Sequence, residues 1–182
     1  MGFLVRITIV GSIGGFLFGY DTGIIAGAQL YFKDDWPEIT TKDKELIVSM
    51  TLIGAVFGAV IAGPISDKYG RRPVIIASDI FFTIGSFMMA FAPTISMLIF
   101  GRVVVGLGVG VASIVVPIYL SECSPVEKRG TIVSTFVVMI TLGQLISSMI
   151  ALACGRDWRL MLGIAGIPSM IQFICMLFMP ES

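Results

Sequence analysis

The chain has 182 residues, of which 56% are hydrophobic and 13% are charged, and its mean hydropathy is +0.98. Soluble domains carry about 25% charged residues, so this composition excludes an ordinary soluble domain. It also excludes disorder, which needs low hydrophobicity. Twelve Lys and Arg residues balance twelve Asp and Glu residues, so no basic surface is expected to bind nucleic acid. The composition predicts an all-α membrane protein.

The residue types that metal and enzyme chemistry need are scarce. The chain has no His, and Cys123, Cys154 and Cys175 are widely spaced without a CxxC pair. Histidine is the commonest general base and metal ligand. No nucleophile with a neighbouring base and no phosphate-binding loop stands out. We therefore predict that the protein is not an enzyme and that it holds no metal and no cofactor.

Apolar segments long enough to cross a bilayer, about 20 residues each, occur six times. In chain order the predicted spans are about 5–31, 46–66, 73–92, 96–121, 131–153 and 159–179. Charged or Pro-containing segments separate them, among them a charged loop at 33–45 and a basic turn at 67–73. The sequence thus predicts one six-helix bundle over residues 1–182, with both termini on the same side of the membrane.

The Lys and Arg residues of the loops predict the orientation, because they collect on the cytoplasmic side. With cytoplasmic termini, the inside set is Arg6, Lys68, Arg71, Arg72, Lys128 and Arg129, and the outside set is Lys33, Lys42, Lys44, Arg156 and Arg159. The difference is only one residue, but the inside set clusters in short turns next to helix ends, where the rule counts most. We expect cytoplasmic termini and a plasma-membrane location. The reverse orientation and an organelle membrane are the alternatives.

Glycine spacing predicts how the helices meet. Small residues recur every four positions in the first, second and fourth spans, at Gly11, Gly15, Gly19, Gly23 and Gly27, at Gly54, Gly58 and Ala62, and at Gly106 and Gly110. Such a stripe lets another helix backbone approach closely. Close packing is the expected role, and lining a cavity is the alternative.

Two charged residues lie inside predicted spans, Asp21 in the first and Arg102 in the fourth. An ionisable residue within the membrane is costly and suggests a function with a partner. Asp21 is about 15 Å from the outer end of its helix and Arg102 about 9 Å, at about 1.5 Å per residue, so the two side chains can meet. Protonation of Asp21 would break the pair and bias a two-state transporter. A static structural ion pair is the alternative.

Three further polar residues lie within spans. Asp79 in the third span is expected to have a structural role, either reaching the interface or making a polar contact with a neighbouring helix. Thr141 and Gln144 near the middle of the fifth span can hold helices together or bind a polyhydroxy substrate. The first and fourth spans, which are glycine-rich and carry the buried charges, each open a group of three. This pattern is typical of a 3+3 inverted repeat.

Five motifs, in order, resemble those of the sugar porter family of the major facilitator superfamily. Residues 14–23 are similar to the first-helix signature and 63–72 to the GxxxDxxGRR loop. Residues 102–110 resemble RxxxGxGxG, 117–130 match PxYxxExxPxxxRG, and 180–182 resemble the start of PESPRW. The chain therefore resembles the N-terminal six-helix half of such a transporter, over nearly its whole length.

The resemblance implies roles for individual residues. In proton-coupled members, the aspartate and arginine corresponding to Asp21 and Arg102 form the protonation site. Phe18 and Gln144 correspond to substrate contacts. Charged residues at the cytoplasmic helix ends correspond to a gating network, which here would comprise Asp67, Arg71, Arg72, Glu122 and Arg129. Such charges can pair in one state and separate in the other.

The sequence departs from the family in ways that bear on the substrate. Val137 stands where sugar porters have a substrate-contacting Gln, while Thr141 to Gln144 resembles the TGGQ of inositol and polyol transporters, in which Asp79 also finds a counterpart. The implied substrate is a myo-inositol-like polyol, with a hexose as the alternative, and Thr141 joins the expected substrate contacts.

The resemblance covers only half of a twelve-span transporter, and a lone half has nothing to move against. We therefore expect proton-coupled secondary active transport of a sugar or polyol in which this chain is one half. The second six-helix half would be covalently joined or a separate chain. The alternative is a structural subunit, derived from a half-transporter, of a larger membrane complex. The buried charges favour transport, because packing alone does not require them.

Overall fold

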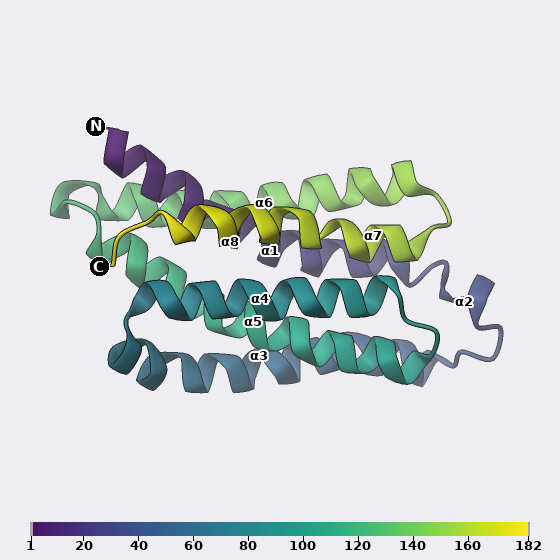
Figure 1. The fold of residues 1–182 in the computed structure, drawn as a ribbon. Coiled ribbons are helices and arrows are strands. Elements are labelled where there is room, and N and C mark those ends of the chain that lie inside the picture. Colours follow the sequence, from purple (N-terminus) through teal and green to yellow (C-terminus); the bar gives the residue numbers. More distant parts are fainter. Residues whose placement is uncertain (1, 182) are drawn as a thin grey trace.

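The computed structural model describes residues 2–181. Met1, and Ser182 at the end of the PESPRW-like motif, lie outside the described residues. The long helices lie side by side, and both ends of the described chain lie at the same end of the bundle (Figure 1). The helices are α1 (Gly2–Ala28), α2 (Phe32–Asp35), α3 (Thr41–Tyr69), α4 (Arg71–Ala90), α5 (Ile95–Glu122), a 3-10 turn (Val126–Lys128), α6 (Arg129–Cys154), α7 (Trp158–Ile164) and α8 (Gly166–Leu177).

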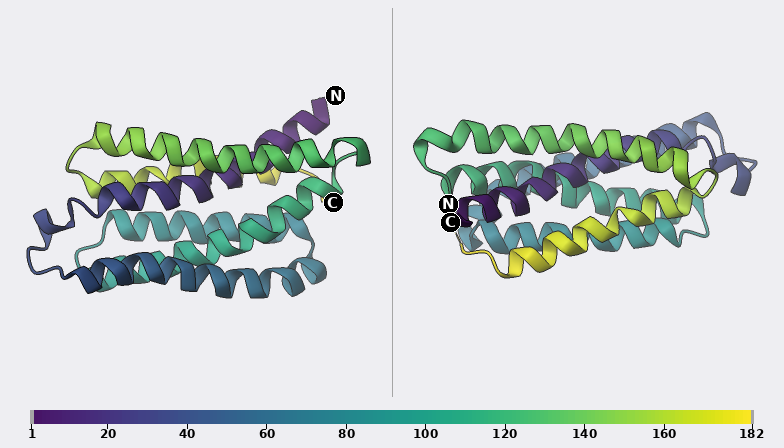
Figure 2. Two further views of the ribbon diagram at one scale, coloured as in Figure 1. Left: turned by 180° about the vertical axis from the view of Figure 1, so that it is seen from behind. Right: turned by 90° about the horizontal axis from the view of Figure 1, so that it is seen from above.

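Within the described residues, six helical segments are long and apolar enough to cross a membrane, so the predicted all-helical, six-span fold class is confirmed. The sixth segment combines α7 and α8. The connections alternate between two ends (Figure 2). We call the end with residues 70, 123–128 and 178–181 the terminal end, and the end with residues 29–40, 91–94 and 155–157 the opposite end.

The start of α3 differs from the prediction. Residues 42–45, expected in a charged loop, form the first turn of the helix. The cause is a capping box at Thr40, whose hydroxyl accepts the Asp43 N–H while the Asp43 carboxylate accepts the Thr40 N–H at 2.9 Å. A capping box satisfies donors that a helix start leaves free. The helix therefore begins well before its apolar stretch.

The turn at 67–73 is shorter than the sequence indicated, because α3 continues to Tyr69 and α4 begins at Arg71. Only Gly70 separates the helices, with φ +92°. Residues with a Cβ rarely adopt this conformation, and a Cβ at Gly70 would also lie 2.6 Å from the Glu181 carboxylate. Gly70 thus lets the chain reverse at the terminal end and leaves room for Glu181.

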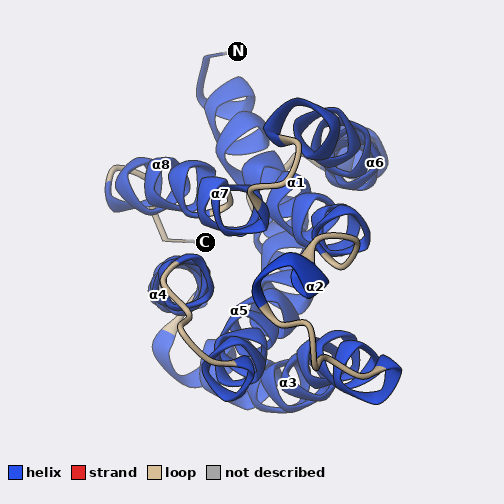
Figure 3. Ribbon diagram, turned by 90° about the vertical axis from the view of Figure 1, so that its right-hand side faces the viewer, coloured by secondary structure: helices blue, strands red, loops and turns tan. Residues whose placement is uncertain are grey.

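The helices pair as an inverted repeat. The first group is α1, α3 and α4, and the second is α5, α6 and α7–α8, with α1 and α5 running in opposite directions (Figure 1). The most extensive contacts join α3 to α5 and α1 to α6. Seen end-on, α5 lies with α3 and α4, while α1 lies with α6 and α7–α8 (Figure 3). The first helix of each group thus packs against the other two helices of the other group.

The glycine stripes lie at these two interfaces. A Cβ at Gly19 of α1 would collide with the Ile140 carbonyl of α6, and one at Gly110 of α5 would collide with the Ala55 carbonyl of α3. The predicted close approach of helices is confirmed at both places. The outer faces of α3 and α6 carry exposed apolar side chains, among them Val56, Phe57, Val60, Val138, Leu145 and Met149.

The opposite end is closed by an aromatic cluster. Trp158 at the start of α7 packs edge-on against Phe32 of α2, with 5.2 Å between ring centroids, and tilted against Trp36 at 5.0 Å. Its indole N–H donates to Asp35 at 3.0 Å, and Arg159 pairs with the same carboxylate at 2.8 Å. These contacts fix the segment after α1 to the start of α7.

Candidate functional site

A buried ion pair joins α1 to α5. Arg102 Nη1 donates to Asp21 Oδ1 at 2.8 Å, and the two side chains are only 1% and 6% exposed. On the residue before Asp21, the Tyr20 hydroxyl donates to the Met161 carbonyl at 2.8 Å, which ties this turn of α1 to α7. The structure thus brings together the two residues that the depth estimate placed within reach. Buried charges are tolerated when they are paired in this way.

The ion pair borders a cavity of about 90 Å³ between α1, α3 and α5. Besides Asp21 and Arg102, it is lined by Thr22, Ile25, Val48, Thr51 and Leu52. Arg102 keeps two nitrogens, Nε and Nη2, without a hydrogen-bond partner in the described structure. A cavity of this size has room for water. The pair therefore sits beside space through which a proton or a polar group can reach it.

The three predicted substrate residues occupy two different settings. Phe18 on α1 is half-buried and lines a small interior cavity with residues of α4 and α5. Thr141 and Gln144 are exposed on α6, and the Thr141 hydroxyl donates to the Val137 carbonyl of its own helix at 3.3 Å. The close contact of Gly23 with the Gln144 backbone holds this part of α6 against α1. Thr141 and Gln144 lie on an open face.

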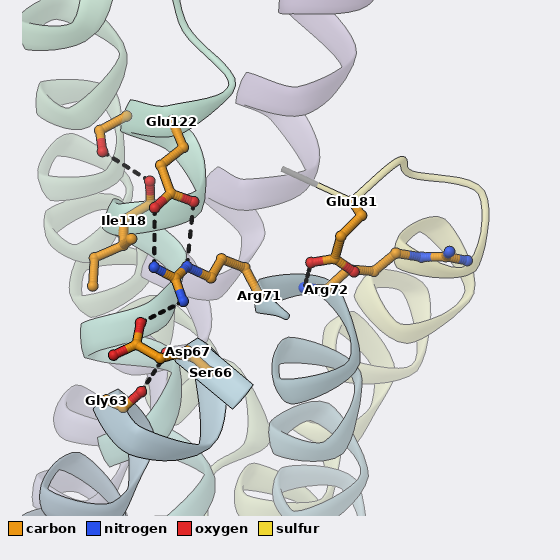
Figure 4. Close-up of polar contacts among 9 residues, drawn as sticks. Gly63, Ser66, Asp67, Arg71, Arg72, Ile118, Glu122 and Glu181 are labelled. Carbon is orange, nitrogen blue, oxygen red and sulfur yellow. Dashed lines mark hydrogen bonds and ion pairs between the residues drawn. The ribbon is translucent and has the colours of Figure 1, made fainter. Parts of the chain in front are cut away.

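At the terminal end, Arg71 connects three helices (Figure 4). Its Nη1 pairs with Asp67 of α3 at 2.7 Å, and its Nη2 and Nε donate to the two carboxylate oxygens of Glu122 on α5 at 3.1 and 3.3 Å. A guanidinium that grips a carboxylate through two bonds fixes its geometry as well as its charge. Three of the five predicted network residues are therefore in direct contact.

Arg72 makes different contacts from its neighbour. Its side chain donates to the Met176 carbonyl at 3.0 Å and the Leu177 carbonyl at 2.5 Å, at the end of α8, while its backbone N–H donates to Glu181 at 3.0 Å (Figure 4). The sequence prediction did not assign Glu181 to the network. The signal was present, since Glu181 belongs to the motif at 180–182, but the motif was used only for recognition.

The fifth predicted network residue lies beyond the end of α5. Arg129 donates through Nε to the Ser124 carbonyl at 3.3 Å, so it holds the connector between α5 and α6. Cys123, in the same connector, is half-buried, and burial raises the pKa of its thiol. The thiol is therefore neutral at pH 7 and suited to packing among apolar side chains.

The inverted pairing of six spans, the buried ion pair and the charged network at one end define one half of a major facilitator fold. The model of the Sugar (and other) transporter family matches residues 7–182. The chain belongs to this family, whose members are transporters rather than enzymes. The family recognised from the sequence motifs is thereby confirmed.

Curated relatives include inositol transporters. Inositol transporter 4 of Arabidopsis thaliana is 48% identical over 99% of this chain, and the proton myo-inositol cotransporter hmit-1.2 of Caenorhabditis elegans is 43% identical over all of it. Among solved structures, the inward-open xylose transporter XylE from E. coli superposes with a TM-score of 0.90 at 26% identity over 98% of this chain. The chain spans about a third of the length of these relatives (32% and 31%) and 48% of XylE.

Proposed function

We propose that this chain is one half of a proton-coupled transporter for myo-inositol or a similar polyol, and that it works with a second six-helix half. The observation that carries the proposal is the Asp21–Arg102 pair, buried between the first helices of the two repeats and next to a cavity. A transporter that couples to protons needs a carboxyl whose protonation alters a contact between moving elements. A structural subunit has no need of a buried acid with water-sized space beside it.

The coupling step follows from the ion pair. With Asp21 ionised, the carboxylate holds Arg102 through a charged hydrogen bond. A proton from the adjacent cavity neutralises Asp21, the attraction is lost, and Arg102 is freed to interact elsewhere. Arg102 Nη1, together with the unpartnered Nε and Nη2, is then available for substrate hydroxyls. Proton binding and substrate binding are linked through the same guanidinium.

Two independent observations support a polyol as the substrate. Relatives that are 48% and 43% identical over nearly the whole chain are named as an inositol transporter and a proton myo-inositol cotransporter. Thr141 and Gln144 present a hydroxyl and an amide on the exposed face of α6, and such groups exchange hydrogen bonds with a polyhydroxy ligand. A second half packed opposite this face would enclose the ligand.

The charged network at the terminal end is the part of the molecule that changes between two states. Asp67, Arg71 and Glu122 hold α3, α4 and α5 together in the arrangement seen here. We place this end in the cytoplasm, in accordance with the distribution of Lys and Arg, and we place the protein in the plasma membrane. Separation of these charges would accompany opening toward the cytoplasm.

The test uses the transporter assembled from this chain and its second half in proteoliposomes. Asp21→Asn should abolish accumulation of labelled inositol against its gradient and its response to an imposed pH gradient, while exchange of internal for external inositol continues. The matched control is Asp157→Asn, the same change at an exposed carboxyl, which should accumulate inositol normally. Normal uphill accumulation by Asp21→Asn would disprove proton coupling through this residue.

The same vesicles test the substrate. An excess of unlabelled hexose should reduce the uptake of labelled inositol much less than an equal excess of unlabelled inositol. Stronger competition by hexose would reassign the substrate. The absence of uptake and of exchange for every polyol and hexose tried, in a correctly folded protein, would favour the structural-subunit alternative.

A further inference from the structure

A second buried carboxyl, Asp79, lies in the interior of the bundle. It is 2% exposed, and its Oδ2 has no hydrogen-bond partner in the described structure. It lines a cavity of about 10 Å³ formed by α1, α4 and α5, together with Gly14, Phe18 and Gly108. A space of that volume holds about one water molecule. Asp79 does not reach the membrane interface, which was one of the roles considered from the sequence.

A buried amide lies beside the same part of α1. Gln172 of α8 is 0% exposed, and neither its Nε2 nor its Oε1 has a partner in the described structure. Its Nε2 is 3.1 Å from the position that a Cβ on Gly14 would occupy, and Gly14 lines the cavity of Asp79. Buried polar atoms without a hydrogen-bond partner are costly. A carboxyl and an amide that both lack partners around one glycine therefore point to a binding site for a small polar group.

The contact between α4 and α8 brings the two side chains to the same level. Ser169, one turn before Gln172, donates to the Asp79 carbonyl at 2.9 Å and shares a hydrogen bond with Thr83 at 2.8 Å. Side chains on a helix tilt toward its N-terminus, so Asp79 tilts toward the terminal end. Gln172 follows Ser169 along α8 in the same direction. The Gln172 amide reaches Gly14, which lines the cavity of Asp79, so the two polar groups lie around the same glycine.

No ion pair neutralises Asp79 among the described residues. The charged and titratable groups of the surrounding helices are engaged elsewhere or lie near the ends. The engaged pairs are Tyr20 with Met161, Asp21 with Arg102, Asp67 and Glu122 with Arg71, Arg72 with the end of α8, Tyr119 with Pro180, and Arg159 with Asp35. The others are Arg6 near the start of α1, 42–45 and 68–69 at the ends of α3, and Cys175 on α8.

We propose that Asp79 and Gln172 form a site that permanently holds one proton and one water molecule. An ionised carboxylate without a partner is too costly to bury, so the Asp79 carboxyl carries the proton. The water accepts one hydrogen from the Asp79 carboxyl and one from the Gln172 amide N–H, which gives Asp79 Oδ2 and Gln172 Nε2 a partner each. A metal cation is excluded as the occupant, because the cavity is too small and one carboxyl and one amide give too few oxygen ligands.

The proton is resident because the space beside Asp79, about 10 Å³, holds only about one water molecule and is enclosed by helices of this half. The helices α1, α4, α5 and α8 pack within one six-helix body, and alternating access moves such bodies largely as units. The surroundings of Asp79 thus stay the same when the two halves move, whereas Asp21 borders the larger cavity of about 90 Å³. The contrast between a resident proton on Asp79 and an exchanging proton on Asp21 rests on the proposed function. The presence of a proton on Asp79 does not.

Infrared spectroscopy of the intact protein in lipid bilayers tests the site directly. At pH 7 the spectrum should show the carbonyl band of a protonated carboxyl, moved to lower frequency in D₂O. The band should be lost in Asp79→Asn and retained in Asp21→Asn, the matched change at the other buried acid. In Gln172→Leu it should shift to higher frequency, because the carboxyl has lost its hydrogen-bonded neighbour.

Three kinds of result would overturn the proposal. One is the absence of the band in the wild-type protein at pH 7, or its persistence in Asp79→Asn. Another is its loss between pH 5 and pH 8, which would make the proton an exchanging one. The third is its loss on replacing choline chloride with sodium chloride at constant pH, which would show a bound cation. Failure of inositol transport would affect none of these readings, so the site and the proposed function fail separately.

Discussion

Arg102 is the least exposed charged residue among those that the structure describes. Its side chain is 1% exposed, one nitrogen binds Asp21, and two nitrogens are unpartnered. The desolvation of such a group is repaid only while its partner remains charged. A change in the charge of Asp21 therefore affects the rest of the molecule through Arg102.

The energy of this pair is testable by removing it in two ways. Arg102→Met leaves a buried carboxylate without a partner and should lower the free energy of unfolding by about 3–5 kcal/mol. The double variant Asp21→Asn, Arg102→Met removes both charges and should recover most of the loss. Denaturant unfolding in detergent micelles measures both. A double variant as unstable as the single one would show that the loss comes from packing and not from the unpaired buried carboxylate.

Glu181 adds a contact at the terminal end whose strength is also measurable. Its carboxylate accepts the Arg72 N–H at the start of α4, where a negative charge is favoured by the helix dipole. Glu181→Gln should weaken this bond by about 1 kcal/mol, which corresponds to about 5-fold faster hydrogen exchange at the Arg72 amide. Glu127→Gln, the same change on the exposed connector, should leave that exchange unaltered. Equal exchange in the two variants would refute the assigned contact.

At the scale of the helices, two interfaces repeat one design. Gly19 and Gly143 let α1 and α6 touch through their backbones, and Gly58 and Gly110 do the same for α3 and α5. The lipid offers no hydrophobic drive for helices to associate, so close packing of this kind must hold them. A side chain at any of these positions separates a helix pair that crosses the whole bundle.

This leads to a prediction with an internal control. Gly19→Ala places a methyl group on the Ile140 carbonyl and Gly110→Ala places one on the Ala55 carbonyl, so each should cost about 1–3 kcal/mol by overpacking. Gly63→Ala, also inside a helix, meets no atom within 4 Å and should be neutral or stabilise by up to about 1 kcal/mol. Denaturant unfolding compares the three. Equal loss in all three would mean that helix contacts are not the cause.

The sequence predicted these elements unevenly, for physical reasons. Apolar length is a local property, so the six spans followed from it, and the four-residue glycine spacing indicated which faces pack closely. The choice of partner helix depends on the three-dimensional arrangement, and spacing alone does not contain it. The Asp21–Arg102 contact could be predicted because the position of each residue along its span gives its depth in the membrane, and the two depths are similar. The role of Gln172 could not be predicted in this way, because the function of a single amide in an apolar helix depends on which side chains of other helices lie beside it.

At the scale of the whole molecule, each end of the bundle is fastened by different chemistry. Arg71 joins three helices by charge at the terminal end, while Trp158 joins two segments mainly by ring contacts at the opposite end. Charged networks respond to competing partners more readily than buried aromatic clusters do. This asymmetry fits the proposal that the charged contacts of the terminal end, rather than the aromatic contacts of the opposite end, are the ones that change between states.

The orientation of these ends in the membrane can be tested with single cysteines. Lys128 in the α5–α6 connector and Arg156 in the α6–α7 connector are both exposed and lie at opposite ends. In a background with Cys123, Cys154 and Cys175 changed to Ser, a membrane-impermeant maleimide added to intact cells should label Arg156→Cys. It should label Lys128→Cys only after the membrane is permeabilised. The positive charges in the short turns of the terminal end are the basis for expecting this orientation. The reverse labelling pattern would disprove cytoplasmic termini and would place the Arg71 network outside the cell.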